Sequence, residues 1–160
     1  MSSLKSHLPK VFGREVVLGE GIALPPEAYN PGRRQYAADY FLPLLKARRP
    51  SPGDLVLGVT PVDLYTEEIP LNFVLGLADR SQGAAIISLA RLDPGFYGLP
   101  PNPDLFHLRA LKEAIHELGH LLGLGHCSDP TCIMFFSNTI SDTDRKGPGF
   151  CPECLKRLGK

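Results

Sequence analysis

The sequence predicts an α/β (α+β) fold built as one domain over residues 1–160. Short apolar segments with strand character flank an amphipathic helical segment in the first half, and a longer helical pattern occupies the second half. A length of 160 residues suits one domain with a substantial buried core. Glycine and proline number 16 each, one residue in five, which predicts many turns but stays below the level typical of disorder.

The first half of the chain predicts a strand, a helix and a second strand, in that order. Residues 15–18 are rich in β-branched side chains, as in a strand, and Gly19 ends this segment. Over 34–49, apolar residues recur at spacings of three and four, the period of an amphipathic helix, and Pro43 predicts a kink or a new turn within it. Residues 55–60 predict a short apolar strand. This order favours a parallel strand pair joined by a crossover helix.

Two further apolar segments, 72–78 and 85–90, predict additional strands. The segment 93–103 is too rich in glycine and proline for a helix or a central strand, so it predicts a loop. Tyr97 in this loop could face a cleft and hydrogen-bond a substrate or a developing oxyanion. An exposed loop tyrosine without such a role is the favoured interpretation.

A helix over 104–122 is predicted from a stripe of apolar side chains at spacings of three and four. The stripe consists of Leu108, Leu111, Ile115, Leu118 and Leu122. At about 100° per residue, His116 and His120 point roughly 140° away from this stripe. We therefore expect the stripe to face the core and the histidines to face outward, toward a cleft.

Several other residues in the second half are expected to have structural roles. Glu113 lies on the outer side of the helix and is expected to be exposed, with a hydrogen bond to a metal-binding histidine as the alternative. Gly119 costs helix stability and so suggests close packing, which we expect against a turn at Met134. Asp142 and Asp144 fall in a polar loop, where solvated side chains are the favoured interpretation and substrate contact is the alternative.

The most specific feature is the run HELGHLLGLGH, which begins at His116. His116 and His120 are four residues apart, so on a helix both imidazoles can reach one cation. Glu117 can lean over the same cation without binding it, as the carboxylate of the zinc-peptidase motif does. Gly123 tolerates the positive φ that would turn the chain and return His126 as a third ligand. Three histidines leave one coordination position open, which predicts a catalytic rather than a structural zinc.

Four cysteines follow this run and form a C-x4-C pair and a C-x2-C pair, with eighteen residues between the pairs. They are Cys127, Cys132, Cys151 and Cys154. The spacing predicts a structural zinc held by all four thiolates, with disulfides or a redox role as the alternatives. Because His126 and Cys127 are consecutive, we expect the two metal sites to be mechanically coupled.

The run from His116 to His126 matches the whole pattern H-E-x-x-H-x-x-G-x-x-H, and a methionine, Met134, follows in the phrase CIM. Together with the four cysteines, this resembles the archaemetzincins, metzincin-clan zinc metallopeptidases with an additional four-cysteine zinc site. The resemblance rests on 116–154, and its motifs are highly specific. It implies two Zn²⁺ per chain, one catalytic and one structural, and places Met134 beneath the catalytic zinc without a bond to it.

The resemblance also implies a compact metzincin-like domain. Its parts are a mixed twisted sheet, a backing helix, an active-site helix and a C-terminal subdomain stapled by zinc. Residues 72–77 would be an antiparallel edge strand that borders the cleft, where an extended peptide could bind by strand addition. An ordinary edge strand without a ligand is the equal alternative. We expect a subdomain boundary between 1–123, which includes the active-site helix, and 124–160, which includes Met134 and the cysteines.

The constellation predicts a zinc-dependent peptidase. Zinc on the three histidines would lower the pKa of its bound water to about 7, and Glu117 would accept the proton as the water attacks a peptide carbonyl. One alternative is a catalytically silent two-zinc binding or scaffold protein, in which Glu117 would have no purpose. Another is a three-histidine metal-dependent hydrolase that acts on RNA, but such proteins lack this glutamate. A third alternative is a hydration site like that of carbonic anhydrase, which would not require an HExxH helix.

Charge and hydropathy limit the partners that we expect. Seventeen basic and seventeen acidic side chains give a formal net charge of zero, which disfavours nucleic acid and anionic membranes. The start, MSSLKSHLPK, lacks a signal-peptide core, and no apolar run is long enough to span a bilayer. We therefore expect a cytoplasmic protein whose partner is a peptide or protein substrate, and the sequence does not predict its oligomeric state. His7 and His107 are expected to be surface or capping residues.

Overall fold

A mixed three-stranded sheet forms the centre of the protein in the computed structural model, which describes residues 2–68 and 70–160. The strand order is β3-β6-β5. The strand β6 (Ala84–Ser88) pairs in parallel with β3 (Val56–Thr60) and antiparallel with β5 (Gly76–Asp79). All five residues of β6 are buried, as expected for a central strand covered on both faces.

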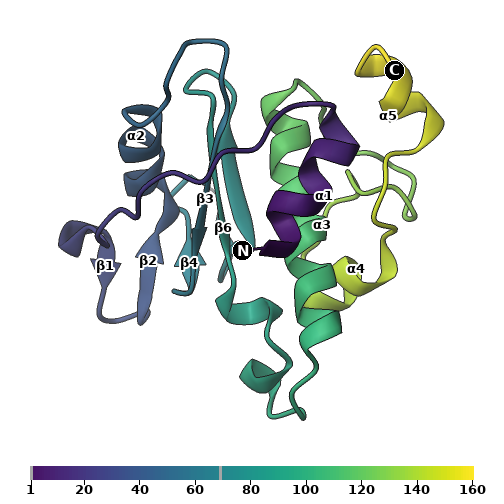
Figure 1. Ribbon diagram of the computed structural model, residues 1–160. Coiled ribbons are helices and arrows are strands. Elements are labelled where there is room, and N and C mark those ends of the chain that lie inside the picture. Colours follow the sequence, from purple (N-terminus) through teal and green to yellow (C-terminus); the bar gives the residue numbers. More distant parts are fainter. Residues whose placement is uncertain (1, 69) are drawn as a thin grey trace.

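Helices cover both faces of this sheet (Figure 1). The short helix α2 (Phe41–Lys46) packs on β3 and β6, whereas α3 (Pro103–Leu121) packs on β5 and β6 from the other side. Side chains of β6 alternate between the two faces: Ile86 packs in the same cluster as α2, and Ile87 in the same cluster as α3. A further helix, α1 (Ser2–Phe12), packs against α3.

The remaining elements are short. A second sheet has the order β1-β2-β4, and the chain after α3 contains two six-residue helices. The bounds are β1 Tyr29–Asn30, β2 Gln35–Ala37, β4 Leu64–Tyr65, α4 Ile140–Arg145 and α5 Pro152–Arg157. Single 3-10 turns lie at Pro26–Ala28, Ala38–Tyr40, Ala90–Leu92 and Pro94–Tyr97.

Two predictions for the first half were wrong. Residues 15–18 form no strand, and the side chain of Val17 is 79% exposed, because the parallel partner of β3 is β6. The predicted helix over 34–49 is helical only in α2, and its first part is β2 followed by a 3-10 turn. Pro43 fits because it lies in the first turn of α2, where its missing N–H breaks no helical hydrogen bond.

The other strand predictions were confirmed, with small shifts of their ends. Residues 55–60 and 85–90 correspond to β3 and β6. The segment 72–78 is a strand only from Gly76 onward, and it is the antiparallel edge strand of the sheet, as the resemblance implied. The predicted loop 93–103 contains a 3-10 turn and no strand.

The bounds of the long helix α3 match the prediction within one residue at each end, but the burial of its side chains differs from the prediction. Ile115 is fully buried as expected, whereas Leu108 at the start of the apolar stripe is 40% exposed. The opposite, polar face is also buried: Arg109, Lys112 and Glu113 are each no more than 4% exposed. The expectation that this face looks outward is therefore wrong for the first half of the helix, which the C-terminal segment covers.

Polar contacts dock α4 on this face of α3. Arg109 binds both carboxylate oxygens of Asp144 at 2.8 and 2.7 Å, and Lys112 Nζ donates to the carbonyl oxygens of Thr143 and Asp144. Glu113 accepts a hydrogen bond of 3.0 Å from Thr143 Oγ1 and lies 3.1 Å from Lys146 Nζ. The latter contact is an ion pair without hydrogen-bond alignment.

The expectations for three acidic residues are corrected by these contacts. Glu113 is buried instead of exposed, and Asp144 pairs with Arg109 instead of being only solvated. Asp142 forms a reciprocal cap with Thr139 at the start of α4. The sequence alone did not reveal these roles because each partner lies about 30 residues away along the chain or in a helix that was not predicted.

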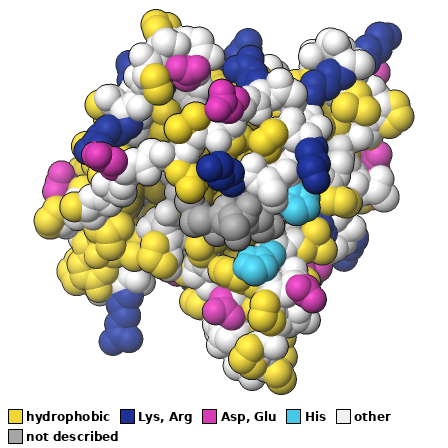
Figure 2. Space-filling view, viewed as in Figure 1, with side chains coloured by type: hydrophobic (Ala, Val, Ile, Leu, Met, Phe, Trp, Pro, Cys, Tyr) yellow, Lys and Arg dark blue, Asp and Glu magenta, His cyan; other side chains and the backbone are white. Residues whose placement is uncertain are grey.

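The surface of the described residues agrees with the balanced composition. In Figure 2, basic and acidic side chains are interspersed over the face in view. No helix in the described parts of the chain has the length and apolar character needed to cross a membrane.

We predict that Lys146→Met lowers the free energy of unfolding by about 3–5 kcal/mol, because it leaves the Glu113 carboxylate buried without its cation. Adding Glu113→Gln should restore much of the loss. Chemical denaturation of the zinc-loaded proteins measures both effects. Arg157→Met is the matched control, since its ion pair with Glu153 is exposed and should contribute less than about 1 kcal/mol. A loss for Lys146→Met as small as that of the control would contradict this account.

Candidate metal centres and cleft

After α3 ends, the chain turns back toward His116 and His120, which lie on that helix. The helix begins after Asn102, whose side chain accepts from the backbone N–H of Leu105, and it ends at Leu121. Gly123 then adopts a φ of 97°, which strongly favours glycine. Its N–H donates to the carbonyl of His120, and the turn that follows leads to His126. The predicted backbone role of Gly123 is confirmed.

The three histidines of the HExxH run lie together. The rings of His116 and His120 are 4.6 Å apart between centroids, and that of His126 is 5.5 Å from the first and 4.8 Å from the second. One ring nitrogen from each lies within 4.8 Å of the others. Nitrogens that bind one tetrahedral zinc at about 2.0–2.1 Å lie about 3.4 Å apart, so this limit is compatible with a shared cation.

Backbone carbonyls orient two of these rings. His116 Nδ1 lies 2.8 Å from the carbonyl oxygen of Ile133, and His120 Nδ1 lies 2.9 Å from that of Leu124. A carbonyl only accepts, so each Nδ1 carries the proton and each Nε2 is free to bind a metal. The two Nε2 atoms are 3.1 Å apart. The motif alone does not predict these partners, because a carbonyl carries no residue-type signal.

Burial lowers the pKa of all three histidines, most strongly that of His116, which also has Lys146 and His120 nearby. The rings are therefore neutral near pH 7 before any metal binds. Neutral imidazole is the form that coordinates zinc, so the site needs no deprotonation step at this pH.

Glu117 lies next to the histidines and is 5% exposed. Burial, and after it the nearby Glu113, raises the pKa of Glu117 to about 8, while Lys146 acts in the opposite direction. A dication on the histidines would also favour the carboxylate form. The protonation of Glu117 is therefore sensitive to a metal on the neighbouring histidines.

An open pocket surrounds these side chains. Residues 73–78, which include the start of β5, form part of its lining, and so do Phe136, Ser137 and Asn138 from the C-terminal segment. The resemblance implied that the edge strand borders the cleft, and this is confirmed. Tyr97 is not among the lining residues, and its hydroxyl donates to the carbonyl of Arg91.

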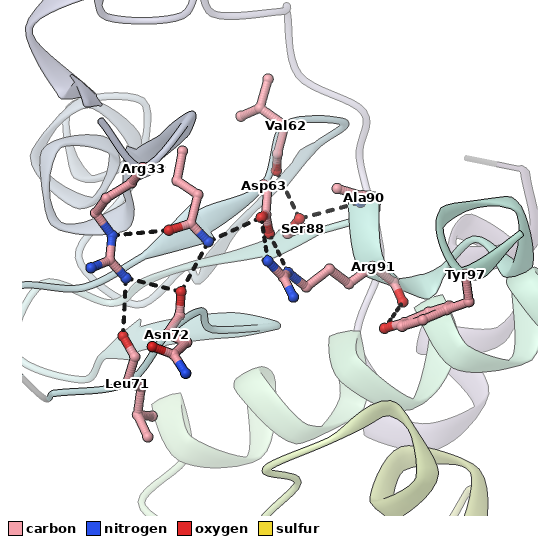
Figure 3. Close-up of polar contacts among 10 residues, drawn as sticks. Arg33, Val62, Asp63, Leu71, Asn72, Ser88, Ala90, Arg91 and Tyr97 are labelled. Atoms are coloured by element: carbon pink, nitrogen blue, oxygen red, sulfur yellow. Dashed lines mark hydrogen bonds and ion pairs between the residues drawn. The ribbon is translucent and has the colours of Figure 1, made fainter. Parts of the chain in front are cut away.

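A polar network anchors the segment that leads into β5 (Figure 3). Arg33 donates to the carbonyls of Leu71 and Asn72 at 3.2 and 2.9 Å. Gln35 donates to the same Asn72 carbonyl and to Asp63, which forms a bidentate ion pair with Arg91. These contacts from the small sheet position one wall of the pocket, and no local pattern in the sequence indicates them because the partners lie about 30–40 residues apart.

The turn at Met134 packs against α3 at Gly119. Met134 is fully buried, and a Cβ placed on Gly119 would be 2.5 Å from its sulfur. The close packing that we expected at Gly119 is therefore confirmed. Cys127 N–H donates to the Met134 carbonyl at 2.9 Å, and Cys127 pairs with Phe135 in a parallel bridge. The residue after His126 is thus hydrogen-bonded directly to this turn.

The four cysteine sulfurs also lie within 4.8 Å of one another. Cys127 and Cys151 Sγ are 3.8 Å apart, and Cys132 and Cys154 Sγ are 3.7 Å apart. Sulfurs on a tetrahedral zinc at about 2.3 Å are separated by about 3.8 Å, whereas a disulfide requires about 2.0 Å. The thiols are free, so the disulfide alternative does not hold and the donor set fits zinc.

We predict that the free energy of unfolding of the metal-free protein falls as the pH drops from about 7.5 to about 5.5. Burial holds the folded pKa values of His116, His120 and His126 below 6.5, so these groups take up as many as about three protons on unfolding in this range. Glu117, whose folded pKa is raised to about 8, releases about one, so the net uptake is as many as about two protons. The histidine contribution to stability is nearly complete at about pH 7.5 and is lost as the pH falls through about 6.5, the unfolded pKa. Urea titrations after chelation measure the slope, which His116→Gln should reduce by about one proton. Equal slopes for wild type and His116→Gln would contradict a lowered pKa for His116 in the folded protein.

Comparison with known proteins agrees with this geometry. The family model described as Peptidase family M54 matches residues 11–160. An archaemetzincin from Methanocaldococcus jannaschii is 50% identical over 155 residues, which cover 97% of this chain and 83% of that protein.

Solved structures of similar proteins share the fold. The crystal structure of an archaemetzincin from Methanopyrus kandleri is 39% identical, with a TM-score of 0.86 over 99% of this chain and 83% of that chain. The structure of a zinc-dependent peptidase from Methanocorpusculum labreanum is 32% identical, with a TM-score of 0.83 over 97% of this chain and 91% of that one. With its histidine triad and four-cysteine cluster, the chain belongs to the archaemetzincins, the zinc metallopeptidases of Peptidase family M54.

Proposed function

We propose that this protein hydrolyses peptide bonds, with His116, His120 and His126 as ligands of a catalytic zinc and Glu117 as the general base. The observation that carries the proposal is the convergence of three histidine nitrogens beside a buried carboxylate in a pocket bordered by an edge strand. A silent scaffold would have no use for a carboxylate at this place.

The residues present fit zinc at the histidines. The Nδ1 contacts with backbone carbonyls leave the Nε2 atoms of His116 and His120 free to bind, and three ligands leave room for a reactant. When bound, zinc supplies Lewis-acid polarisation of the attacking water and of the scissile carbonyl.

Glu117 then moves the proton. Its carboxylate accepts a proton from the attacking water at an Oε atom, and the carboxylic acid delivers that proton to the nitrogen of the leaving amine. The buried position suits both steps, because a carboxyl group with a raised pKa holds a proton between them more readily than a solvated one.

The proposed substrate is an extended peptide along β5. Within the described residues, β5 pairs with β6 on one side, while its other side lies at the pocket. A peptide that adds to this free edge would form backbone hydrogen bonds and place a carbonyl near the histidines. Peptides are also the substrates that a peptidase family implies.

We further propose that Cys127, Cys132, Cys151 and Cys154 hold a structural zinc, which gives two Zn²⁺ per chain. The thiol of Cys151 is poised for this role, since N–H donation from Cys154 and contacts with neighbouring thiols lower its pKa to about 7. In this proposal Met134 supports the catalytic site without binding zinc, and 124–160 is a subdomain that the structural zinc holds against 1–123.

We predict that Glu117→Gln lowers kcat by about 10²- to 10⁴-fold and leaves both zinc ions bound, since glutamine keeps the shape but cannot accept the proton. Cleavage of a broad peptide library, read by mass spectrometry, gives the activity, and elemental analysis gives the zinc content. Glu153→Gln, an exposed change on α5, is the control. Equal cleavage by wild type and Glu117→Gln would refute the assigned base. No cleavage by the zinc-loaded wild type would favour the scaffold alternative.

We predict that Cys151→Ser removes the cysteine-bound zinc and also lowers activity by about 10- to 100-fold. The physical reason is the direct connection of Cys127 to His126 and its hydrogen bond to the Met134 turn. Zinc content and peptide cleavage are the measurements. His126→Ala is the reciprocal control, since it should lose activity and keep the cysteine-bound zinc. Full activity and catalytic zinc in Cys151→Ser would show that the sites are independent.

A further inference from the structure

Gly76, the first residue of β5, approaches Glu117 too closely to carry a side chain. A Cβ at this position would lie 2.5 Å from Glu117 Oε1 and 2.7 Å from both Cδ and Cγ. The backbone conformation does not require glycine, because Gly76 is not among the glycines with positive φ. The reason for a glycine here is therefore the space that the Glu117 side chain occupies.

We propose that Gly76 is a positioning residue for Glu117. The bare backbone at the start of β5 forms the surface on which the carboxylate rests, and this contact determines where the carboxylate lies relative to the histidines. The proposal rests on the proposed function, in which Glu117 is the base.

Other interactions do not hold the carboxylate in place. Within the part of the chain that the structure describes, no hydrogen bond or ion pair fixes the Glu117 side chain. Glu113, one helical turn earlier, is occupied by Thr143 and Lys146 and repels a second carboxylate. Glu117 is nevertheless almost fully buried, so van der Waals packing must determine its position.

The strand itself cannot easily move away. Gly76 pairs with Ile87 of the central strand β6, and the preceding carbonyl, that of Leu75, accepts from Ser88 N–H at 2.9 Å. One residue earlier, Val74 N–H donates to the carbonyl of Leu64 in the small sheet. An added side chain at Gly76 therefore displaces the Glu117 carboxylate, by roughly 1 Å if ordinary contact distances are to be restored.

The protein offers a matched control in the same sheet. Gly58 on β3 is crowded to a similar degree, since a Cβ there would lie 2.8 Å from Leu45 Cδ1 on α2. This contact is on the face of the sheet opposite α3, and Gly58 does not line the pocket. Gly58→Ala thus reports the cost of overpacking a strand without contact to Glu117.

The test compares Gly76→Ala, Gly58→Ala and wild type, all loaded with zinc. We expect Gly76→Ala to lower kcat by about 10²-fold, because a shift of about 1 Å misplaces the base, with KM changed less than about threefold and zinc content unchanged. Gly58→Ala should lose thermal stability and keep kcat. Crystal structures of the zinc forms should show the carboxylate of Glu117 displaced only in Gly76→Ala, with the histidines in place.

Two results would overturn the proposal: a kcat of Gly76→Ala within about threefold of wild type, or a Glu117 carboxylate that stays in place while β5 shifts. If the wild type cleaves no peptide, the proposed function fails, and the crystal structures alone decide whether Gly76 positions Glu117. The two failures are therefore distinguishable.

Discussion

The burial of α3 on two sides is the constraint on which the rest of the structure depends. One side of the helix packs on the central sheet, and the other carries Arg109, Lys112 and Glu113 into the C-terminal segment. Buried charges are tolerated only when they are paired, so the C-terminal segment must supply complementary groups in one register. That register also places the carbonyl of Ile133 against His116. Docking of the segment and orientation of the metal site are therefore one event.

The two donor clusters share the same short stretch of backbone. His126 belongs to one and Cys127 to the other, and Cys127 N–H is hydrogen-bonded to the carbonyl of Met134. The chain after α3 has two six-residue helices and little core of its own, so the proposed zinc on the four cysteines would hold it in place. The cleft has a further wall in β5, which the Arg33 and Gln35 network anchors from behind. Three separate parts of the chain, α3, β5 and the C-terminal segment, thus line the pocket that contains Glu117.

Local patterns predicted α3, β3 and β6 well because each has a strong period or a continuous apolar run. The segment 15–18 failed for the opposite reason: its strand character is real, but a strand needs a partner, and β6 took that place beside β3. The donor clusters were predictable because metal chemistry restricts both residue type and spacing. Gly76 was not, because a glycine in a strand carries no sign of which side chain it must leave room for.

What the sequence determined by itself is the chemistry available to this protein: three histidines, one glutamate and four cysteines at spacings that suit two metal sites. These depend on covalent spacing and helical period, which are local. The tertiary structure decided the environment of that chemistry. It buried Glu113 against Lys146, set carbonyls behind His116 and His120, and brought β5 against Glu117. Such contacts join residues far apart in the chain, and only packing selects them among the many pairings that the composition allows.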